Sequence, residues 1–196
     1  MFMLTERLFL RPLWPEDADA LAEKLSVRDV AWNLGSVPIP YARKDAEAKI
    51  AADWAAWPMK VSLAIFLRTE DGPAYVGGIG FDRHSELKGL PEMGYWIAKP
   101  YWGRGIAAEA GEAVLEHAFL AWQLPVIGAG HYFDNPASGR VLGKLGFRAT
   151  GEILAYPSVP RGCDVDSVEY QLTRTDWLAR RGYAAPCVEA AKRRAA

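Results

Sequence analysis

The sequence predicts a single α/β (α+β) domain built around one sheet, and three observations support this. The length of 196 residues fits one domain. A meander of strand-like segments occupies the middle of the chain, and strands alternate with helices after Pro100. Hydrophobic residues make up 51% and charged residues 24%, a globular balance that argues against disorder. We expect the domain to span residues 1–182, and the alanine-rich residues 183–196 to form a frayed tail.

The N-terminal region predicts one strand and two helices. Residues 6–13 alternate apolar and charged side chains, as a half-buried strand does, and Pro12 closes the strand. A helix opens at Pro15, which two acidic residues follow, because proline and acids suit the first turn. A second helix covers 43–57 and ends at Pro58. The side chains expected on the buried faces of these helices are Leu21, Leu25, Val30, Ile50, Trp54 and Trp57.

The meander consists of strands expected over residues 61–68, 74–82 and 92–99. The turns between them are too short for a crossover helix, so neighbouring strands should be antiparallel. Gly77, Gly78 and Gly80 interrupt the second of these strands. Glycine inside a strand marks a bulge or a close backbone crossing, and we do not expect a second phosphate-binding loop there.

The C-terminal half alternates helices and strands. We expect, in order, a helix over residues 103–121, a strand over 125–130, a helix over 135–145, and strands over 147–154 and 165–174. A short helix follows, with Thr175 as its N-cap and Gly182 as its stop. The sequence has no internal repeat and no long linker, so these segments should join one sheet.

Composition and charge exclude several classes of protein. The 23 basic and 24 acidic residues give a net charge of −1, so no overall positive field favours direct nucleic-acid binding. No apolar run approaches the roughly 18 residues of a membrane span, and the N-terminal residues become charged at Glu6, before a signal peptide's apolar region can form. We therefore expect a cytoplasmic protein without a membrane partner. Cys163, Cys187 and the three histidines show no metal-ligand spacing, so we expect no metal.

The most informative segment is EMGYWIAKPYWGRGIAAEAG, residues 92–111. A strand leads through Gly103-x-Gly105 directly into a long helix. The first N–H groups of a helix are unpaired and carry partial positive charge. Glycines let an anion approach these groups, and Arg104 adds a full charge. The segment therefore predicts a cradle for an anion such as a pyrophosphate.

Two other interpretations of these glycines stay open. They can simply form a tight turn between a strand and a helix. The spacing Gly103-x-Gly105-x-x-Ala108 also fits a dinucleotide-binding fingerprint, but that fold needs repeated βαβ units, and only one strand–helix pair follows here. A P-loop is excluded because no Gly-Lys-Ser/Thr follows.

The segment GYWIAKPYWGRGIAAEA, residues 94–110, resembles the acetyl-CoA-binding motif of the GNAT acyltransferase superfamily. It most resembles the branch that contains the ribosomal-protein N-terminal (alanine/serine) acetyltransferases. Further matches are TERLFLRPL at 5–13, Asn135 with Ser138, KLGF at 144–147 and VEYQLTRTDW at 168–177. The resemblance covers about residues 4–178. Trp102 stands where the superfamily usually has Gln or Arg, as is common in this branch.

The resemblance implies a GNAT-like domain with a mixed, mostly antiparallel central sheet, splayed middle strands and helices on both faces. It implies acetyl-CoA as co-substrate, with the pantetheine arm between the splayed strands and the pyrophosphate at the N–H groups of residues 103–107. Asn135 would hydrogen-bond the arm from the other side. The cofactor-binding residues that it implies are Trp96, Ile97, Ala98, Trp102, Gly103, Arg104, Gly105, Ile106, Ala107, Asn135 and Ser138.

Acetyl transfer requires that the amine lose a proton, that the oxyanion be stabilised and that the thiolate be protonated. Glu92 is the candidate base, because it begins the strand that carries the acyl group and shares a face with Gly94 and Trp96. It can equally be a rim carboxylate, with water as the base. Ser138 is the candidate proton donor to the sulfur, or else a helix-end cap. Leu142 stands where many members of the superfamily have a tyrosine acid.

The remaining polar and aromatic residues allow two interpretations each. Asp82 and His84 can touch substrate or lie in a solvated loop, His117 is expected to be structural, and His131 can be either. The aromatic residues before the meander can wall an acceptor groove or pack in the core. These are Trp32, Tyr41, Trp54 and Trp57.

Together these features predict an acetyl-CoA-dependent N-acetyltransferase that acts on a primary amine by direct attack in a ternary complex. The acceptor is a protein N-terminus or a small-molecule amine such as an amino acid, a polyamine or an aminoglycoside-like compound. The alternatives are a non-catalytic acyl-CoA-binding or sensor module and, more remotely, a dinucleotide-dependent oxidoreductase. Edge strands and surface aromatic residues are compatible with a homodimer.

Overall fold

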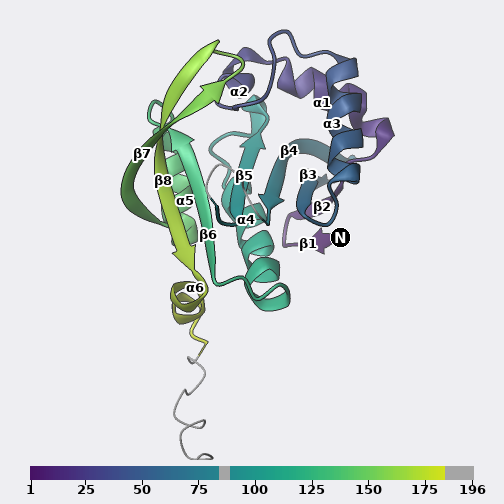
Figure 1. Cartoon of the computed structure of the whole chain (residues 1–196). Helices are drawn as coiled ribbons and strands as arrows, with labels where there is room; N and C mark the ends of the chain where they lie inside the picture. The colour runs from purple at the N-terminus through teal and green to yellow at the C-terminus, as the bar shows by residue number, and fades with distance from the viewer. Residues whose placement is uncertain (84–88, 184–196) are drawn as a thin grey trace, which may run out of the picture.

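The computed structural model describes residues 1–83 and 89–183 (Figure 1). Within these residues the strands form one eight-stranded sheet in the order β1-β2-β3-β4-β5-β6-β8-β7. Neighbouring strands are antiparallel except β5 and β6, which run parallel. The expected mixed, mostly antiparallel sheet is therefore confirmed. His84, Cys187 and the expected tail beyond Tyr183 lie outside the described residues.

The strands agree with the sequence prediction to within a few residues, apart from β1, which was not expected. They are β1 (Met3–Leu4), β2 (Leu8–Pro12), β3 (Lys60–Thr69), β4 (Gly72–Asp82), β5 (Glu92–Ile97), β6 (Val126–Tyr132), β7 (Arg148–Ser158) and β8 (Cys163–Thr173). The last two form a hairpin that is longer at its tip than the sequence suggests.

The helices required more correction. They are α1 (Ala18–Leu25), α2 (Arg28–Ala31), α3 (Arg43–Ala55), α4 (Ile106–Glu116), α5 (Pro136–Leu145) and α6 (Arg174–Arg180). Val30 is buried on the separate helix α2 and not on α1. The helix expected from residue 103 begins only at Ile106, and its last turn, His117–Ala121, is π-helical. Thr173, not Thr175, caps α6 by accepting a hydrogen bond from the Asp176 N–H.

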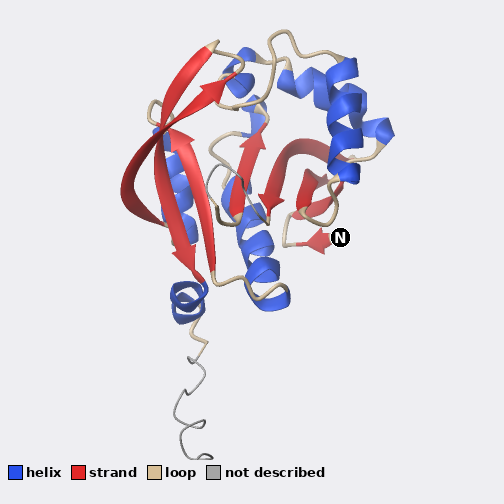
Figure 2. Cartoon of the chain, viewed as in Figure 1, coloured by secondary structure: helices blue, strands red, loops and turns tan. Residues whose placement is uncertain are grey.

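Helices cover both faces of the sheet, as expected (Figure 2). One core joins α1, α2 and α3 to the face that carries Ala64 and Phe66. The other core joins α4, α5 and α6 to the opposite face, which carries Leu63 and Ile65. Because both faces of the central strands are buried, β3 is an almost continuous apolar run and not an alternating one. No helix in the described part of the chain is long and apolar enough to cross a membrane.

The expected burial of Trp54 and Trp57 in the core was wrong, and the alternative, that they wall an acceptor groove, stays a prediction. The two residues are 52% and 42% exposed, and Trp57 lies beyond the end of α3. Trp54 lies over the edge of the core, where its indole N–H donates to the Leu13 carbonyl oxygen at 2.8 Å. Tyr41 is buried, and Trp32 is partly buried.

The glycines of β4 lie at a bulge and a close backbone crossing, as predicted. The register of β3 against β4 shifts between Ile65 and Phe66, opposite the start of the glycine run. A Cβ at Gly77 would lie 2.4 Å from the Trp96 carbonyl oxygen, and one at Gly78 would lie 2.6 Å from the Trp96 indole nitrogen. Only a residue without a side chain allows β5 to approach β4 this closely.

We expect Gly77→Ala to lower the free energy of unfolding by about 1–3 kcal/mol, as overpacking of a filled site does. Urea denaturation measures the change. Gly80→Ala is the matched control on the same strand, because its Cβ would meet its nearest atom at 3.7 Å, an ordinary contact. Equal stability of the two variants would show that the crossing at Gly77 is not tight.

Candidate functional site

The two halves of the sheet meet at one point and then separate. Within the described residues, β5 and β6 share a single register pair, Glu92 with Gly128. The Gly128 N–H donates to the Pro91 carbonyl oxygen at 2.7 Å next to it. From there the two strands diverge toward their C-terminal ends, as Figure 1 shows. The expected splay of the middle strands is confirmed, and we call the space between them the split.

One edge of β5 lines the split. The Ala98 N–H donates to the Val76 carbonyl oxygen of β4 at 2.8 Å, so the backbone groups of Ala98 point away from β6. Because successive residues of a strand point their backbone groups to opposite sides, those of Tyr95 and Ile97 face the split. The Ile97 carbonyl oxygen accepts a hydrogen bond from the Trp102 indole N–H at 2.6 Å. Of residues 96–98, it is therefore Ile97 that presents its backbone to this space.

The open end of β5 leads into the glycine turn and α4. Gly103 and Gly105 have φ of +74° and +76°, the left-handed region that glycine adopts without strain. Gly105 is the N-cap of α4, and no side chain of the described residues caps that end. A Cβ at Gly103 would meet nothing within 4 Å. The first turn of α4 thus offers uncapped N–H groups beside a surface that no side chain obstructs, which suits a bound anion.

Arg7, which lies 97 residues before Arg104 in the sequence, forms hydrogen bonds that hold this turn. This role was not predicted from the sequence. The Arg7 guanidinium Nε donates to Glu109 Oε2 at 2.7 Å, and its Nη1 donates to the Arg104 carbonyl oxygen at 3.1 Å. Burial alone would raise the pKa of Glu109, but hydrogen bonds from Thr5 and Arg7 outweigh burial and hold that pKa below its usual value. Because Arg7 and Glu109 are 102 residues apart, no local pattern could reveal the pair.

A hydrogen bond crosses the split between β5 and α5. The Tyr95 hydroxyl lies 2.8 Å from the Ser138 hydroxyl and 3.0 Å from the Ser138 carbonyl oxygen, to which it donates. Burial raises the pKa of Tyr95 to about 12, against the opposing effect of its hydrogen bond with Ser138, so this hydroxyl keeps its proton. Asn135 caps α5, since its side chain accepts the Ser138 N–H at 3.3 Å. Leu142 is fully buried in the core.

Glu92 and Ser138 occupy different parts of the split. Glu92 lies at the closed end, between Asp82 of β4 and Gly128 of β6. Ser138 lies on α5 and meets Tyr95, which is three residues further along β5 than Glu92. The site therefore has a carboxylate at the base of the split, a pair of hydroxyl groups across it and an anion cradle at its open end.

The other polar candidates have structural contacts. Asp82 forms an ion pair with Lys60 at 3.1 Å. The His117 ring packs edge-on against Trp122, and burial lowers its pKa. The His131 ring packs against Tyr170 on the neighbouring strand. Within residues 1–83 and 89–183, no group of three or more His, Cys, Asp or Glu side chains could hold a metal ion.

The β7–β8 hairpin is fastened to the segment after α2. Arg161, whose side chain is 8% exposed, forms two hydrogen bonds with Asp134 at 2.7 and 3.1 Å. Its Nε donates to the Trp32 carbonyl oxygen at 3.0 Å. The Val159 N–H donates to the Gly35 carbonyl oxygen at 2.8 Å. The bonds to Trp32 and Gly35 join the hairpin to the N-terminal half of the chain, and the bonds to Asp134 tie it to the segment just after β6.

Comparison with known proteins identifies relatives over most of the chain. A family model described as "Acetyltransferase (GNAT) domain" matches residues 7–148. The uncharacterized N-acetyltransferase YoaA of Bacillus subtilis is 29% identical over 170 residues, 87% of this chain and 95% of that protein. The ribosomal-protein-serine acetyltransferase of Escherichia coli is 32% identical over 76 residues, which are 39% of this chain and 42% of that protein.

The fold also has relatives among solved structures. The structure of Mycobacterium smegmatis RimJ in complex with CoA-disulfide superposes with a TM-score of 0.72 at 25% identity, and covers 92% of this chain and 91% of that one.

We expect Asp134→Asn to loosen the hairpin and to lower stability at neutral pH by about 1 kcal/mol, the upper range for a partly exposed ion pair. The bond to Arg161 lowers the pKa of Asp134. Its stabilisation is therefore full above the unfolded-state pKa of about 3.9 and is lost as pH falls through the lower folded-state value. Thermal melts at pH 7 and pH 3 measure this.

The gap between the melting temperatures of the variant and the wild type should accordingly narrow at pH 3. Glu152→Gln, an exposed carboxylate on the same hairpin, is the control. A gap that is unchanged between the two pH values would mean that the charge of Asp134 does not hold the hairpin.

Proposed function

The chain belongs to the GNAT acetyltransferase family, and on that premise we propose that it is an acetyl-CoA-dependent N-acetyltransferase acting on a primary amine by direct attack in a ternary complex. One observation carries the proposal, namely a split in the sheet that leads to an uncapped helix N-terminus at a Gly-x-Gly turn. An extended molecule with a phosphate group at one end fits that shape. The proposal includes a cytoplasmic location, as the sequence predicts.

The residues along the split suit acetyl-CoA. The N–H groups of residues 103–107 and the guanidinium of Arg104 would hold the pyrophosphate. The exposed edge of β5 at Tyr95 and Ile97 supplies backbone partners for the amide groups of the pantetheine arm. Along β5 the backbone rises by roughly 17 Å from Glu92 to Ile97, at about 3.3 Å per residue. That length is the part of the split between its closed end and Ile97, from which the chain continues to the glycine turn.

In the proposed reaction the amine nitrogen attacks the thioester carbonyl carbon, a C–N bond forms and the C–S bond breaks. The amine proton passes to Glu92, directly or through water, and a proton passes to the departing sulfur. Ser138 is the proposed donor, and the Tyr95 hydroxyl, which keeps its proton, stands next to it to share or replace that proton. An α-amine, with a pKa near 8, needs only a weak base for this step.

The relatives leave the acceptor open. The match to the ribosomal-protein-serine acetyltransferase covers 39% of this chain, so it does not transfer that protein's acceptor. Cofactor sites carry over between relatives better than acceptor pockets do.

Binding of acetyl-CoA is the first test. Thermal-shift titrations with acetyl-CoA, CoA and NADPH should give a concentration-dependent rise in melting temperature for the first two ligands only. Gly103→Asp, whose Cβ would meet nothing within 4 Å, should raise the Kd of acetyl-CoA at least about tenfold over Gly103→Asn, because like charges a few ångströms apart repel by about 1.4 kcal/mol or more. The Asn variant has the same backbone strain and nearly the same shape. Equal Kd values would refute the pyrophosphate assignment.

The proton-transfer roles are tested by Glu92→Gln, Ser138→Ala and Tyr95→Phe. Glu92→Gln should lower kcat by about 10²-fold or more, the range for loss of a general base. Ser138→Ala and Tyr95→Phe should each lower kcat with little change in acetyl-CoA affinity. Glu70→Gln, on an exposed turn, is the control. If kcat is unchanged in Glu92→Gln, water serves as the base. If the protein binds the thioester but turns over no amine, it is a binding module and not an enzyme.

A further inference from the structure

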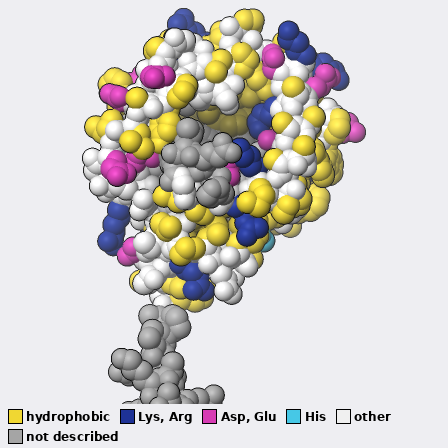
Figure 3. Space-filling view, viewed as in Figure 1, with side chains coloured by type: hydrophobic (Ala, Val, Ile, Leu, Met, Phe, Trp, Pro, Cys, Tyr) yellow, Lys and Arg dark blue, Asp and Glu magenta, His cyan; other side chains and the backbone are white. Residues whose placement is uncertain are grey.

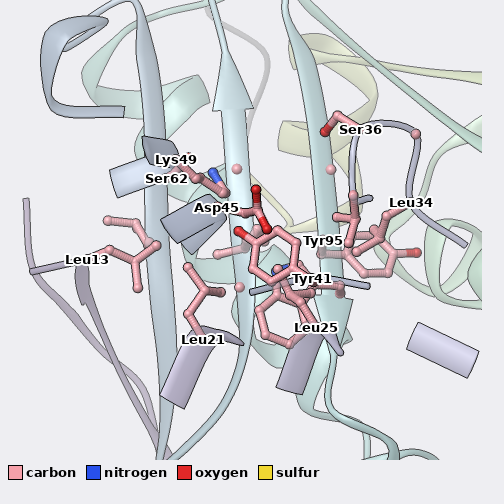
Figure 4. A pocket seen from close by; sticks show the side chains of 18 of the residues that line it. Leu13, Leu21, Leu25, Leu34, Ser36, Tyr41, Asp45, Lys49, Ser62 and Tyr95 are labelled. Atoms are coloured by element: carbon pink, nitrogen blue, oxygen red, sulfur yellow. The ribbon is translucent and has the colours of Figure 1, made fainter. Parts of the chain in front are cut away.

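A cavity of about 590 Å³ lies on the face of the sheet covered by α1 and α3. Figure 4 shows its lining, in which leucines of α1 and the neighbouring segments face Tyr41, Asp45 and Tyr95. Hydrophobic side chains gather around the corresponding hollow in Figure 3. A volume of this size lies within the range of roughly 300–1,000 Å³ that is typical of small-molecule sites.

The floor of the cavity is bare backbone of β4 and β5. Gly78, Gly80 and Gly94 line it. A Cβ at Gly94 would meet nothing within 4 Å, so at this point the cavity reaches down to the strand itself. Tyr95 itself is part of the lining, and its hydroxyl meets Ser138 of α5. The cavity therefore shares a residue with the place where the proposed acetyl transfer occurs.

The walls are mainly aliphatic, and two buried hydroxyl groups interrupt them. Within the described residues, Tyr41 and Tyr75 have no hydrogen-bond partner for their hydroxyl groups, although these side chains are only 7% and 8% exposed. Burial raises the pKa of Tyr41 to about 12, with the charges of Asp45 and Asp53 adding to it, and burial also raises the pKa of Tyr75. Both hydroxyl groups therefore remain donors. Buried donors are almost always paired in proteins, so a ligand with an acceptor oxygen would complete this site.

The charges at the cavity favour a cation. Lys49 lines it but forms an ion pair with Asp53 at 2.7 Å. Asp45 also lines it, in the first turn of α3, where its carboxylate accepts the Ala42 N–H. Within the described residues Asp45 forms no ion pair with a lysine or arginine side chain, so its negative charge would attract an ammonium group.

Hydrogen bonds from the β7–β8 hairpin fix the part of the cavity rim formed by residues 34–38. Residues 34–38 form part of the lining, and the hairpin fixes this segment through the bond from the Val159 N–H to the Gly35 carbonyl oxygen. Arg161 ties the hairpin to Trp32 just before that segment. A rim fastened in this way suits a compact ligand better than an extended polypeptide, which needs an open groove or a strand edge.

From this arrangement we propose that the acceptor is a small primary amine with an apolar body and one acceptor oxygen near the amine, as in an apolar amino-acid derivative. This inference rests on the proposed acetyl transfer. The aliphatic walls bury the body, Asp45 attracts the ammonium form, and Tyr41 and Tyr75 donate to the oxygen. The amine then lies over Gly94, next to Tyr95 and the split.

The test compares leucinamide with glycinamide, which has the same amine and amide but no apolar body. Thiol release from acetyl-CoA gives kcat/KM, and calorimetry in the presence of CoA gives the Kd of each amine. We expect kcat/KM to be at least about tenfold higher for leucinamide than for glycinamide, and its Kd to be at least about tenfold lower. Burial of a leucine side chain provides enough binding free energy for a difference of this size. Spermidine and a peptide with an N-terminal alanine should both be poorer substrates than leucinamide.

Gly94→Leu tests the location, because its Cβ would meet nothing within 4 Å and its side chain would take up space in the cavity. It should lower kcat/KM for leucinamide at least about tenfold and spare the KM of acetyl-CoA. Gly143→Leu is the matched control, because a Cβ there also meets nothing within 4 Å but lies on the exposed side of α5. It should behave as the wild type.

The outcomes separate the two proposals. If acetyl-CoA is bound and consumed but spermidine, glycinamide or the peptide is preferred, or Gly94→Leu has no effect, the acceptor class is wrong and the acetyltransferase function stands. If acetyl-CoA is neither bound nor consumed, both proposals fail. If acetyl-CoA is bound without turnover, equal Kd values for leucinamide and glycinamide overturn the acceptor class.

Discussion

The organisation of this protein depends on the backbone hydrogen-bond ladder between β5 and β6, which stops after one residue pair. Buried backbone groups need partners, and in an ordinary sheet β6 would supply them to β5 beyond Glu92. Here the strands diverge, and one edge of β5 at Tyr95 and Ile97 is left to other groups. The Trp102 indole bonded to the Ile97 carbonyl oxygen is one such substitute. A co-substrate that lies along this edge would satisfy a requirement created by the fold itself.

A sheet interrupted in this way must be held together by other means. The core around α4 and α5 spans both halves on one face, since α4 packs against β2, β4 and β5 while α5 packs against β6. On the other side the hairpin closes the gap through Arg161 and Gly35. The split is thus a gap in the hydrogen bonding between β5 and β6, and helices packed against both halves hold its two sides together.

How much could be predicted from the sequence depends on how far apart the interacting residues are. The glycine turn rests on residues within a few positions of one another, and its pattern predicted it. The cap that Asn135 provides for α5 was not predicted, because the resemblance assigned this side chain to the pantetheine arm. The sequence also predicted the bulge in β4. It failed for Trp54, because the periodicity of α3 does not show how much of the helix the core covers. It missed the Tyr95–Ser138 bond, which joins a strand to a helix 43 residues away.

The brace between Arg7 and Glu109 has a consequence for the order in which the molecule is made. Contacts between residues 102 positions apart form slowly, because a long loop must close first. Arg7 leaves the ribosome early, and its partner emerges only after the whole meander has been synthesised. The hydrogen bonds from Arg7 that hold the anion-cradling turn can therefore form only after the chain has been made as far as Glu109. A ligand that binds only the finished turn then stabilises the docking of the first strand as well.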